Sequence, residues 1–156
     1  MNTQNFVIER QTLGYTIKHY EGKKMIIKLP SHFNGNEIEI IGDYAFSGNK
    51  SVNQVIIPSG IKCIDFYAFA QCSNLESITI PNTVSEINSH AFYECHSLKQ
   101  VIFKGTKAQW NKIYSYDDYV KTMFEGIVVF EPESYLSKFL NNVSKDHNID
   151  SSHNEK

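Results

Sequence analysis

Residues 64–86 read IDFYAFAQCSNLESITIPNTVSE, and a version of this stretch lies on each side of it. Residues 41–63 read IGDYAFSGNKSVNQVIIPSGIKC, and residues 87–109 read INSHAFYECHSLKQVIFKGTKAQ. The three segments align without a gap at a spacing of 23 residues, and a fixed period of this length is the signature of a repeat protein. The columns that are apolar in every copy are Ile41/Ile64/Ile87, Ala45/Ala68/Ala91, Phe46/Phe69/Phe92, Val52/Leu75/Leu98, Val55/Ile78/Val101 and Ile57/Ile80/Phe103.

A unit of this length is too short to bury its own apolar face, so neighbouring units must stack and share one core. Within residues 75–80, LESITI, apolar Ile78 and Ile80 alternate with polar Ser77 and Thr79, which is the periodicity of a strand. Equivalent strands of successive units then pair in parallel. Pro81 follows directly and should end the strand, because proline lacks the N–H that pairing needs. The pattern predicts a right-handed solenoid of short parallel strands.

The rest of each unit must carry the chain back to the next strand. Residues 65–72, DFYAFAQC, contain Ala68 and Phe69 as their only strongly inward pair, and we predict one turn of α-helix or 3₁₀ helix there. Residues 25–30, MIIKLP, resemble the strand of an earlier, irregular unit. Its spacing to the next strand is about five residues too long, so residues 33–36 should form a protruding loop.

An open solenoid exposes sheet edges and core at both ends and needs caps. At the N-terminus, residues 1–24 offer two strands, 6–10 and 15–20, and we expect them to form a β-meander with the strand that follows. At the C-terminus, the stretch GIVVF at 126–130 should be the last strand. The end of the core should be covered by an aromatic and apolar cluster of Trp110, Ile113, Tyr114, Tyr116 and Tyr119.

Residues 131–143 carry apolar side chains at helical spacing, and Pro132 is acceptable in a first turn, so we predict a helix that packs by one face. Its apolar residues are Tyr135, Leu136, Phe139, Leu140 and Val143. Residues 144–156 are polar and are predicted to be disordered. The expected organisation is one domain over 1–143, with an N-terminal β cap over 1–24, repeats over 25–109 and a C-terminal cap and helix over 110–143.

Composition narrows the classes of partner. With 156 residues, 41% of them hydrophobic, the chain is long enough to bury one substantial core. The net charge is −2 and basic residues form no stripe, so we expect no nucleic-acid partner. No apolar run approaches the roughly 18 residues of a membrane helix, so no membrane insertion is expected. The first twenty residues lack the apolar core of a signal peptide, which by itself predicts a cytoplasmic protein.

With these residues in view, the repeat resembles the BspA-like, Treponema-type leucine-rich repeat, whose unit runs IGxxAFxxCxxLxxIxIPxxVxx. Residues 64–86 depart from that pattern only at the glycine, where Asp65 stands, and the ending GTKAQWNKI at 105–113 resembles the family's closing segment. Asn88 also replaces the glycine, and Asn49 replaces a cysteine. The resemblance covers residues 25–113 and implies a leucine-rich-repeat solenoid that binds protein or host matrix, in some members as a bacterial surface adhesin. It therefore implies cell-surface display or secretion, against the cytoplasmic expectation.

The three cysteines carry two open interpretations. Cys72 and Cys95 lie one period apart and should stack about 5 Å apart, the spacing of neighbouring strands. They can form a disulfide or a column of buried thiols that pack like small hydrophobes. Cys63 occupies a column that holds Glu86 in the next unit, so we expect it to be exposed.

No residue pattern points to catalysis. His90 and His96 flank Cys95, but the first should point outward and the cysteine inward, so we expect no metal site. Asp117 and Asp118 suit a turn or helix start better than a general acid and base, and no glycine-rich phosphate loop is present. The sequence therefore predicts no enzyme activity and no cofactor.

The candidate binding face consists of the outward positions along the central strands. They are Asn53, Gln54, Ile56, Glu76, Ser77, Thr79, Lys99, Gln100 and Ile102. Isoleucines on a polar sheet face can form a contact patch, although β-branched residues also simply favour strands. A second candidate is the Tyr44/Tyr67/His90 column with Tyr93, which can equally be packing at the coil corners.

These features favour a non-catalytic recognition module whose strand face binds a protein or glycoprotein. The alternative is a structural protein that self-associates through the solenoid edge or through the predicted helix over 131–143.

Overall fold

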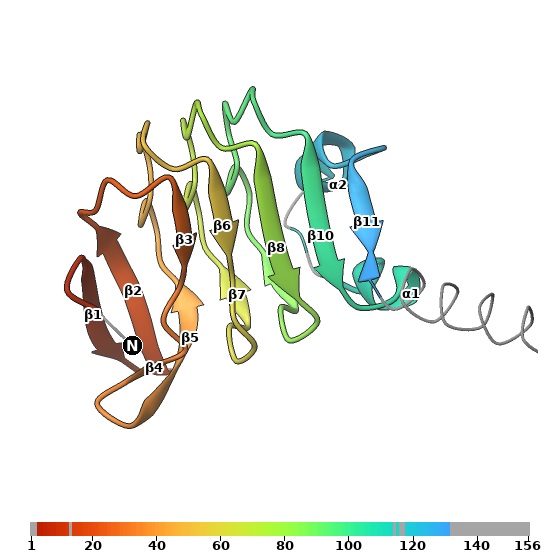
Figure 1. Cartoon of the computed structure of the whole chain (residues 1–156). Coiled ribbons are helices and arrows are strands. Elements are labelled where there is room, and N and C mark those ends of the chain that lie inside the picture. The colour runs from red at the N-terminus through yellow and green to blue at the C-terminus, as the bar shows by residue number, and fades with distance from the viewer. Residues whose placement is uncertain (1–2, 13, 114, 116–117, 132–156) are drawn as a thin grey trace, which may run out of the picture.

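The computed structural model describes residues 3–12, 14–113, 115 and 118–131. In it the chain winds as a solenoid, and successive strands from β5 to β10 alternate between two sheets (Figure 1). Sheet 1 is parallel throughout and has the spatial order β3 (Ile26–Lys28), β6 (Gln54–Ile56), β8 (Ser77–Pro81), β10 (Gln100–Lys104) and β11 (Val128–Phe130). Sheet 2 has the order β1 (Phe6–Gln11), β2 (Gly14–Tyr20), β5 (Asn36–Ile41), β7 (Cys63–Ile64) and β9 (Glu86–Ile87), and β4 (His32–Phe33) pairs with β5.

The six apolar columns line the space between the two sheets, as the repeat predicts. Phe46, Phe69 and Phe92 are each at most 1% exposed, and their rings stack with centroids 4.8 Å and 5.3 Å apart. The caps extend this stack at both ends, because Tyr20 lies 5.3 Å from Phe46 and Phe124 lies 5.0 Å from Phe92. One continuous core therefore runs the length of the solenoid and confirms the predicted fold class.

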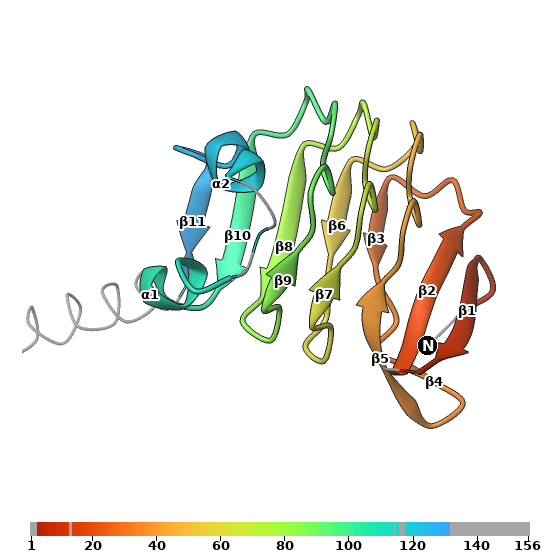
Figure 2. The same cartoon turned by 180° about the vertical axis from the view of Figure 1, so that it is seen from behind.

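Each unit contributes a second short strand that the sequence did not predict. Ile41, Ile64 and Ile87 are fully buried and end β5, β7 and β9, which pair in parallel in sheet 2 (Figure 2). The strands β7 and β9 have only two residues each, which is too few to show an alternating pattern in the sequence. A single inward isoleucine was the only signal available.

The prediction of helical corners is wrong. Residues 66–71 form consecutive turns, with Tyr67 and Gln71 in the left-handed region at φ 54° and 57°. Alternate amides are used between units: the Phe69 N–H donates to the Ala91 carbonyl and the Gln71 N–H to the Tyr93 carbonyl, whereas Ala68 and Ala70 donate within the turns. Because the Phe69 and Gln71 donors pair with the next coil, they are not free to make the bonds of a helix.

The N-terminal cap differs from the predicted meander. The strands β1 and β2 form the expected antiparallel hairpin, but β2 then pairs in parallel with β5 of sheet 2. The next strand along the chain, β3, belongs to sheet 1. The loop predicted at 33–36 is present as the turn of the β4–β5 hairpin, where Asn34 and Gly35 have φ 50° and 80°.

The C-terminal cap is built from β11 and two short helices, α1 (Lys107–Trp110) and α2 (Tyr119–Met123). Trp110 and Ile113 are buried as predicted, but Tyr119 is 37% exposed and does not cover the core. That role falls to Val120 and Phe124, which the sequence analysis did not select. Tyr114, Tyr116, the helix predicted over 131–143 and the tail 144–156 lie outside the described residues, apart from Glu131.

Two further predictions concern the end of β8 and membrane-spanning helices. Pro81 is the last residue of β8 and lies opposite Lys104, so this strand ends at the proline and not before it. Among the described residues, no helix is long and apolar enough to cross a membrane.

Candidate functional site

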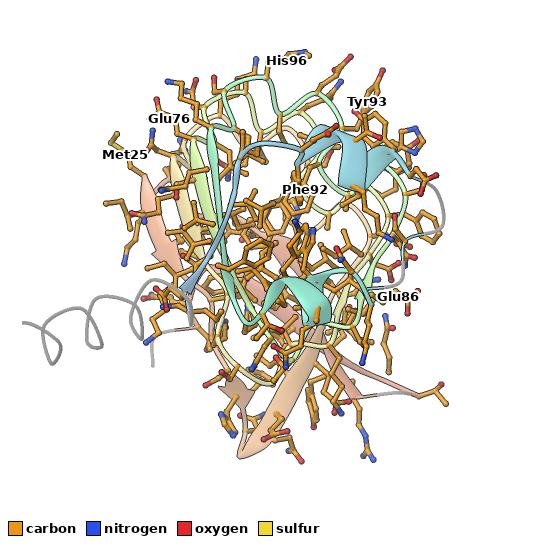
Figure 3. All side chains as sticks on the ribbon, turned by 90° about the vertical axis from the view of Figure 1, so that its right-hand side faces the viewer. Met25, Glu76, Glu86, Phe92, Tyr93 and His96 are labelled. Carbon is orange, nitrogen blue, oxygen red and sulfur yellow. The ribbon has the colours of Figure 1, made fainter. Side chains whose placement is uncertain are left out.

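The candidate face is the outward side of sheet 1. Val55, Ile78 and Val101 are fully buried, so their neighbours along β6, β8 and β10 point away from the core. Figure 3 shows Glu76 and Met25 on this side of the molecule, and Tyr93 and Glu86 on the other. The nine residues named from the sequence come from three adjacent strands and the residue before each, and the structure brings them together on one face.

A row of three apolar side chains and one threonine, here called the outer apolar row, crosses this face at one register. Ile56 lies opposite Thr79, Thr79 opposite Ile102, and Ile102 opposite Val129 of β11. Thr79 is only 7% exposed because an isoleucine flanks it on each side, whereas Val129 is 44% exposed. The row therefore extends one strand beyond the predicted set, and Val129 was missed because β11 lies outside the 23-residue register.

An outer polar row runs beside it, formed by Gln54, Ser77 and Gln100. The Ser77 hydroxyl oxygen is shielded from solvent and has no hydrogen-bond partner among the described residues. An unpaired hydroxyl at such a place costs stability.

The start of the strands is marked by the bordering column of Asn53, Glu76 and Lys99. The Asn53 carbonyl accepts from the amides of Glu76 and Ser77, and the Glu76 carbonyl accepts from those of Lys99 and Gln100. The Glu76 carboxylate lies 3.8 Å from the Lys99 ammonium, with side chains 49% and 74% exposed. Because both side chains are exposed, their charges are accessible to a partner. An exposed pair of this kind adds little to stability.

The second candidate surface is an aromatic column at the coil corners. Tyr44 stacks on Tyr67, Tyr67 on His90, and His90 on Tyr119, with ring centroids 5.2 Å apart at each step. Tyr93 packs its edge against Tyr67 at 6.2 Å. Because the ring faces are used against one another, this column ties the coils and α2 together, and the packing interpretation describes it better than a binding site.

The stacked thiols of Cys72 and Cys95 belong to the core. Both residues are buried, the Cys72 thiol donates to the Phe46 carbonyl at 3.1 Å, and the Cys95 thiol donates to the Phe69 carbonyl at 3.0 Å. The structure has them as free thiols in a column, which is the packing interpretation. The Cys95 thiol and burial both raise the pKa of Cys72, which keeps it protonated.

Cys63 is not exposed as predicted but half-buried. Burial, with the charges of Glu86, Asp65 and Asp43, raises its pKa to about 12. Such a thiol is a poor nucleophile at neutral pH, because the thiolate is the reactive form.

The residues considered for a metal site do not converge. His90 is held in the aromatic column, and the Cys95 thiol points to a backbone carbonyl. Among the residues that the structure describes, no group of three histidine, cysteine, aspartate or glutamate side chains is arranged to hold a metal ion.

Comparison with known proteins places this geometry in a family. Residues 24–120 match the family model of the BspA type leucine rich repeat region, in six copies. No curated protein matches the chain.

Solved structures agree. A leucine rich repeat protein of T. pallidum is 28% identical with a TM-score of 0.63, and the match covers 67% of this chain and 53% of that one. This chain thus spans about half the length of the T. pallidum protein. A leucine-rich repeat protein of Bacteroides capillosus is 20% identical with a TM-score of 0.61, and the match covers 84% of this chain and 97% of that one. One of Bacteroides ovatus is 24% identical with a TM-score of 0.57, and the match covers 67% of this chain and 30% of that one. At these identities the two matches show the fold alone. With the repeat, the stacked core and the family match in agreement, the chain belongs to the BspA type leucine rich repeat proteins.

Proposed function

We propose that this protein is a non-catalytic recognition module that binds a protein or glycoprotein partner through the outward face of sheet 1. The observation that carries the proposal is the outer apolar row of Ile56, Thr79, Ile102 and Val129, which runs across four parallel strands on the molecular surface. A contiguous apolar strip rimmed by polar side chains is typical of a protein contact site.

The surroundings of the row support the same proposal. The outer polar row supplies the side-chain amides of Gln54 and Gln100, and the bordering column supplies one negative and one positive charge. Polar groups around an apolar strip fix the orientation of a partner, while the strip contributes most of the affinity.

The test has two steps and one matched control. A photo-cross-linking residue at Thr79 is used to identify the bound protein, with the same residue at Ser85 as control, because Ser85 is exposed in the segment that leads into sheet 2. The affinity of that protein is then measured for the chain with Ile56→Arg and Ile102→Arg together. We expect the double variant to bind about ten-fold more weakly or worse, because residues at the centre of an interface carry most of the binding energy. The Ser85→Arg control should bind as the native chain does. Equal affinity of the double variant and the native chain would reject this face.

A second candidate function is self-association through the edge of β3, where a specific observation favours it. The hairpin of β1 and β2 extends sheet 2 and leaves the outer edge of β3 without a strand partner in the described structure. Met25 and Ile26 at this edge are 66% and 60% exposed. Two copies can pair such edges about a two-fold axis.

Light scattering at rising protein concentration tests this candidate. Dimerisation that Ile26→Lys abolishes would support it, since a lysine on an edge strand blocks pairing. A monomer at every concentration would remove it.

A further inference from the structure

The C-terminal end of the solenoid carries a groove between α1, α2 and β11. It has a volume of about 610 Å³, and its apolar lining comes from Trp110, Phe124, Val128 and Phe130. Its polar lining comes from Lys107, Asn111, Asp118, Lys121, Thr122 and Glu125. The core ends here: Trp110 lies 5.9 Å from Phe124, which in turn contacts the last ring of the phenylalanine stack.

This end of sheet 1 is open in the described residues. The last strand, β11, pairs only with β10, so its outer edge has no strand partner there. Apolar side chains beside a free edge are what a solenoid must cover with a cap.

The chain itself supplies a segment of suitable length at the right place. Phe130 lines the groove and Glu131, which follows it, forms an ion pair with Lys104 of β10. The described part of the chain therefore ends at the edge of the groove. If residues 132–143 are helical, they measure about 18 Å, enough to cross the end of a small domain.

The pattern of these residues matches the apolar part of the groove. At helical spacing, Tyr135, Leu136, Phe139, Leu140 and Val143 fall on one side, and Ser134 and Asn141 fall on the opposite side. Such a stripe needs an apolar partner, and Phe130, which lies directly before this segment in the chain, belongs to the apolar part of the groove.

We propose that residues 132–143 form an amphipathic helix that lies in this groove with its apolar stripe against Trp110, Phe124 and Phe130, and so completes the C-terminal cap. This inference is independent of the recognition face, because the groove lies at the end of the solenoid and not on the outward side of sheet 1.

Trp110 is the only tryptophan in the chain, so its fluorescence in the full-length protein reports on the groove. Phe139→Asp places a charge in the apolar stripe, and Asn141→Asp places the same charge on the opposite side as the matched control. Trp110 is 9% exposed and lines the groove, so we expect Phe139→Asp to uncover the groove side of the indole, to shift the emission to longer wavelength and to raise the acrylamide quenching constant. The control should match the native protein. Native-like fluorescence of Phe139→Asp would overturn the proposal.

Amine cross-linking of the native chain gives a readout that does not depend on a variant folding. A link from Lys138 to Lys107 or Lys121 is expected, and in a one-to-one mixture of isotopically light and heavy protein it should join residues of the same chain. Links between light and heavy chains would assign the groove to a second copy and overturn the proposal, as would the absence of any such link.

Discussion

The inward columns and the outward rows of the same units differ sharply in how much they vary. The inward column Phe46/Phe69/Phe92 keeps one residue type, is buried and stacks ring on ring. The outward column Asn53/Glu76/Lys99, in the same units, changes from neutral to negative to positive. Stacking constrains the first set because every inward side chain must fit its two neighbours. The outward side chains do not have to fit into a packed core, and even the Glu76–Lys99 pair is largely exposed, so this set is free to carry specificity.

The largest expected effect comes from cutting the inward stack. Phe69→Ala removes a fully buried ring from the middle of the column and should lower the free energy of unfolding by about 3–5 kcal/mol. Phe66→Ala, in the same unit, is the matched control, because Phe66 is 38% exposed and points outward. Urea denaturation gives both values. A loss for Phe69→Ala no greater than that for Phe66→Ala would contradict the shared core.

The next effect concerns the unit in which asparagine replaces the buried cysteine. The Asn49 carboxamide oxygen accepts from the amides of Ser51 and Val52, and its NH₂ group donates to the Gly22 carbonyl of the N-terminal segment. Asn49→Ala should therefore cost about 1–2 kcal/mol, since it leaves part-buried amides without their acceptor. Thermal and urea unfolding check the value, with the exposed Asn82→Ala as control. A native-like midpoint for Asn49→Ala would show that these hydrogen bonds do not hold the first unit to its cap.

The smallest effect on stability is expected at the acidic corner of Asp43 and Asp65. Partial burial, the Asp65 charge and a hydrogen bond with Asp65 raise the pKa of Asp43 above its ordinary 3.8. The folded state then binds the proton more tightly than the unfolded state does. The associated stability is present below pH 3.8 and is lost as the pH rises through the higher folded pKa.

Asp43→Asn should therefore stabilise the protein relative to the native chain at pH 7, and the difference should shrink as the pH falls below about 4. Urea midpoints of the two proteins at pH 7 and at pH 3.5 measure it. A variant that is less stable than the native chain at neutral pH would show that the carboxylate makes a favourable contact there.

The sequence predicted the parts of the molecule that repeat, and it failed where they stop repeating. Three aligned units were enough to place the core columns and the outward rows of β6, β8 and β10. Tyr20 and Phe124 complete the same ring stack, but they lie at spacings of 26 and 32 residues from Phe46 and Phe92 and left no periodic signal. Val129 was not predicted as part of the candidate face for the same reason.

The prediction of helical turns at the coil corners was wrong for a different reason. Local composition at residues 65–72 suits a helical turn, yet the amides of Phe69 and Gln71 bond to the next coil. Which partner a backbone amide takes is decided by the stacking of units, and local propensity does not report it.

The comparison between inward columns and outward rows is tested most directly by two displayed libraries sorted for resistance to protease. One library varies Phe46, Phe69 and Phe92, and the other varies Ile56, Thr79 and Ile102. We expect the first to keep folded variants only with large apolar residues, and the second to keep folded variants with most residue types other than proline and glycine. An outward library as restricted as the inward one would mean that the outer row is held by the fold and is not free to serve recognition.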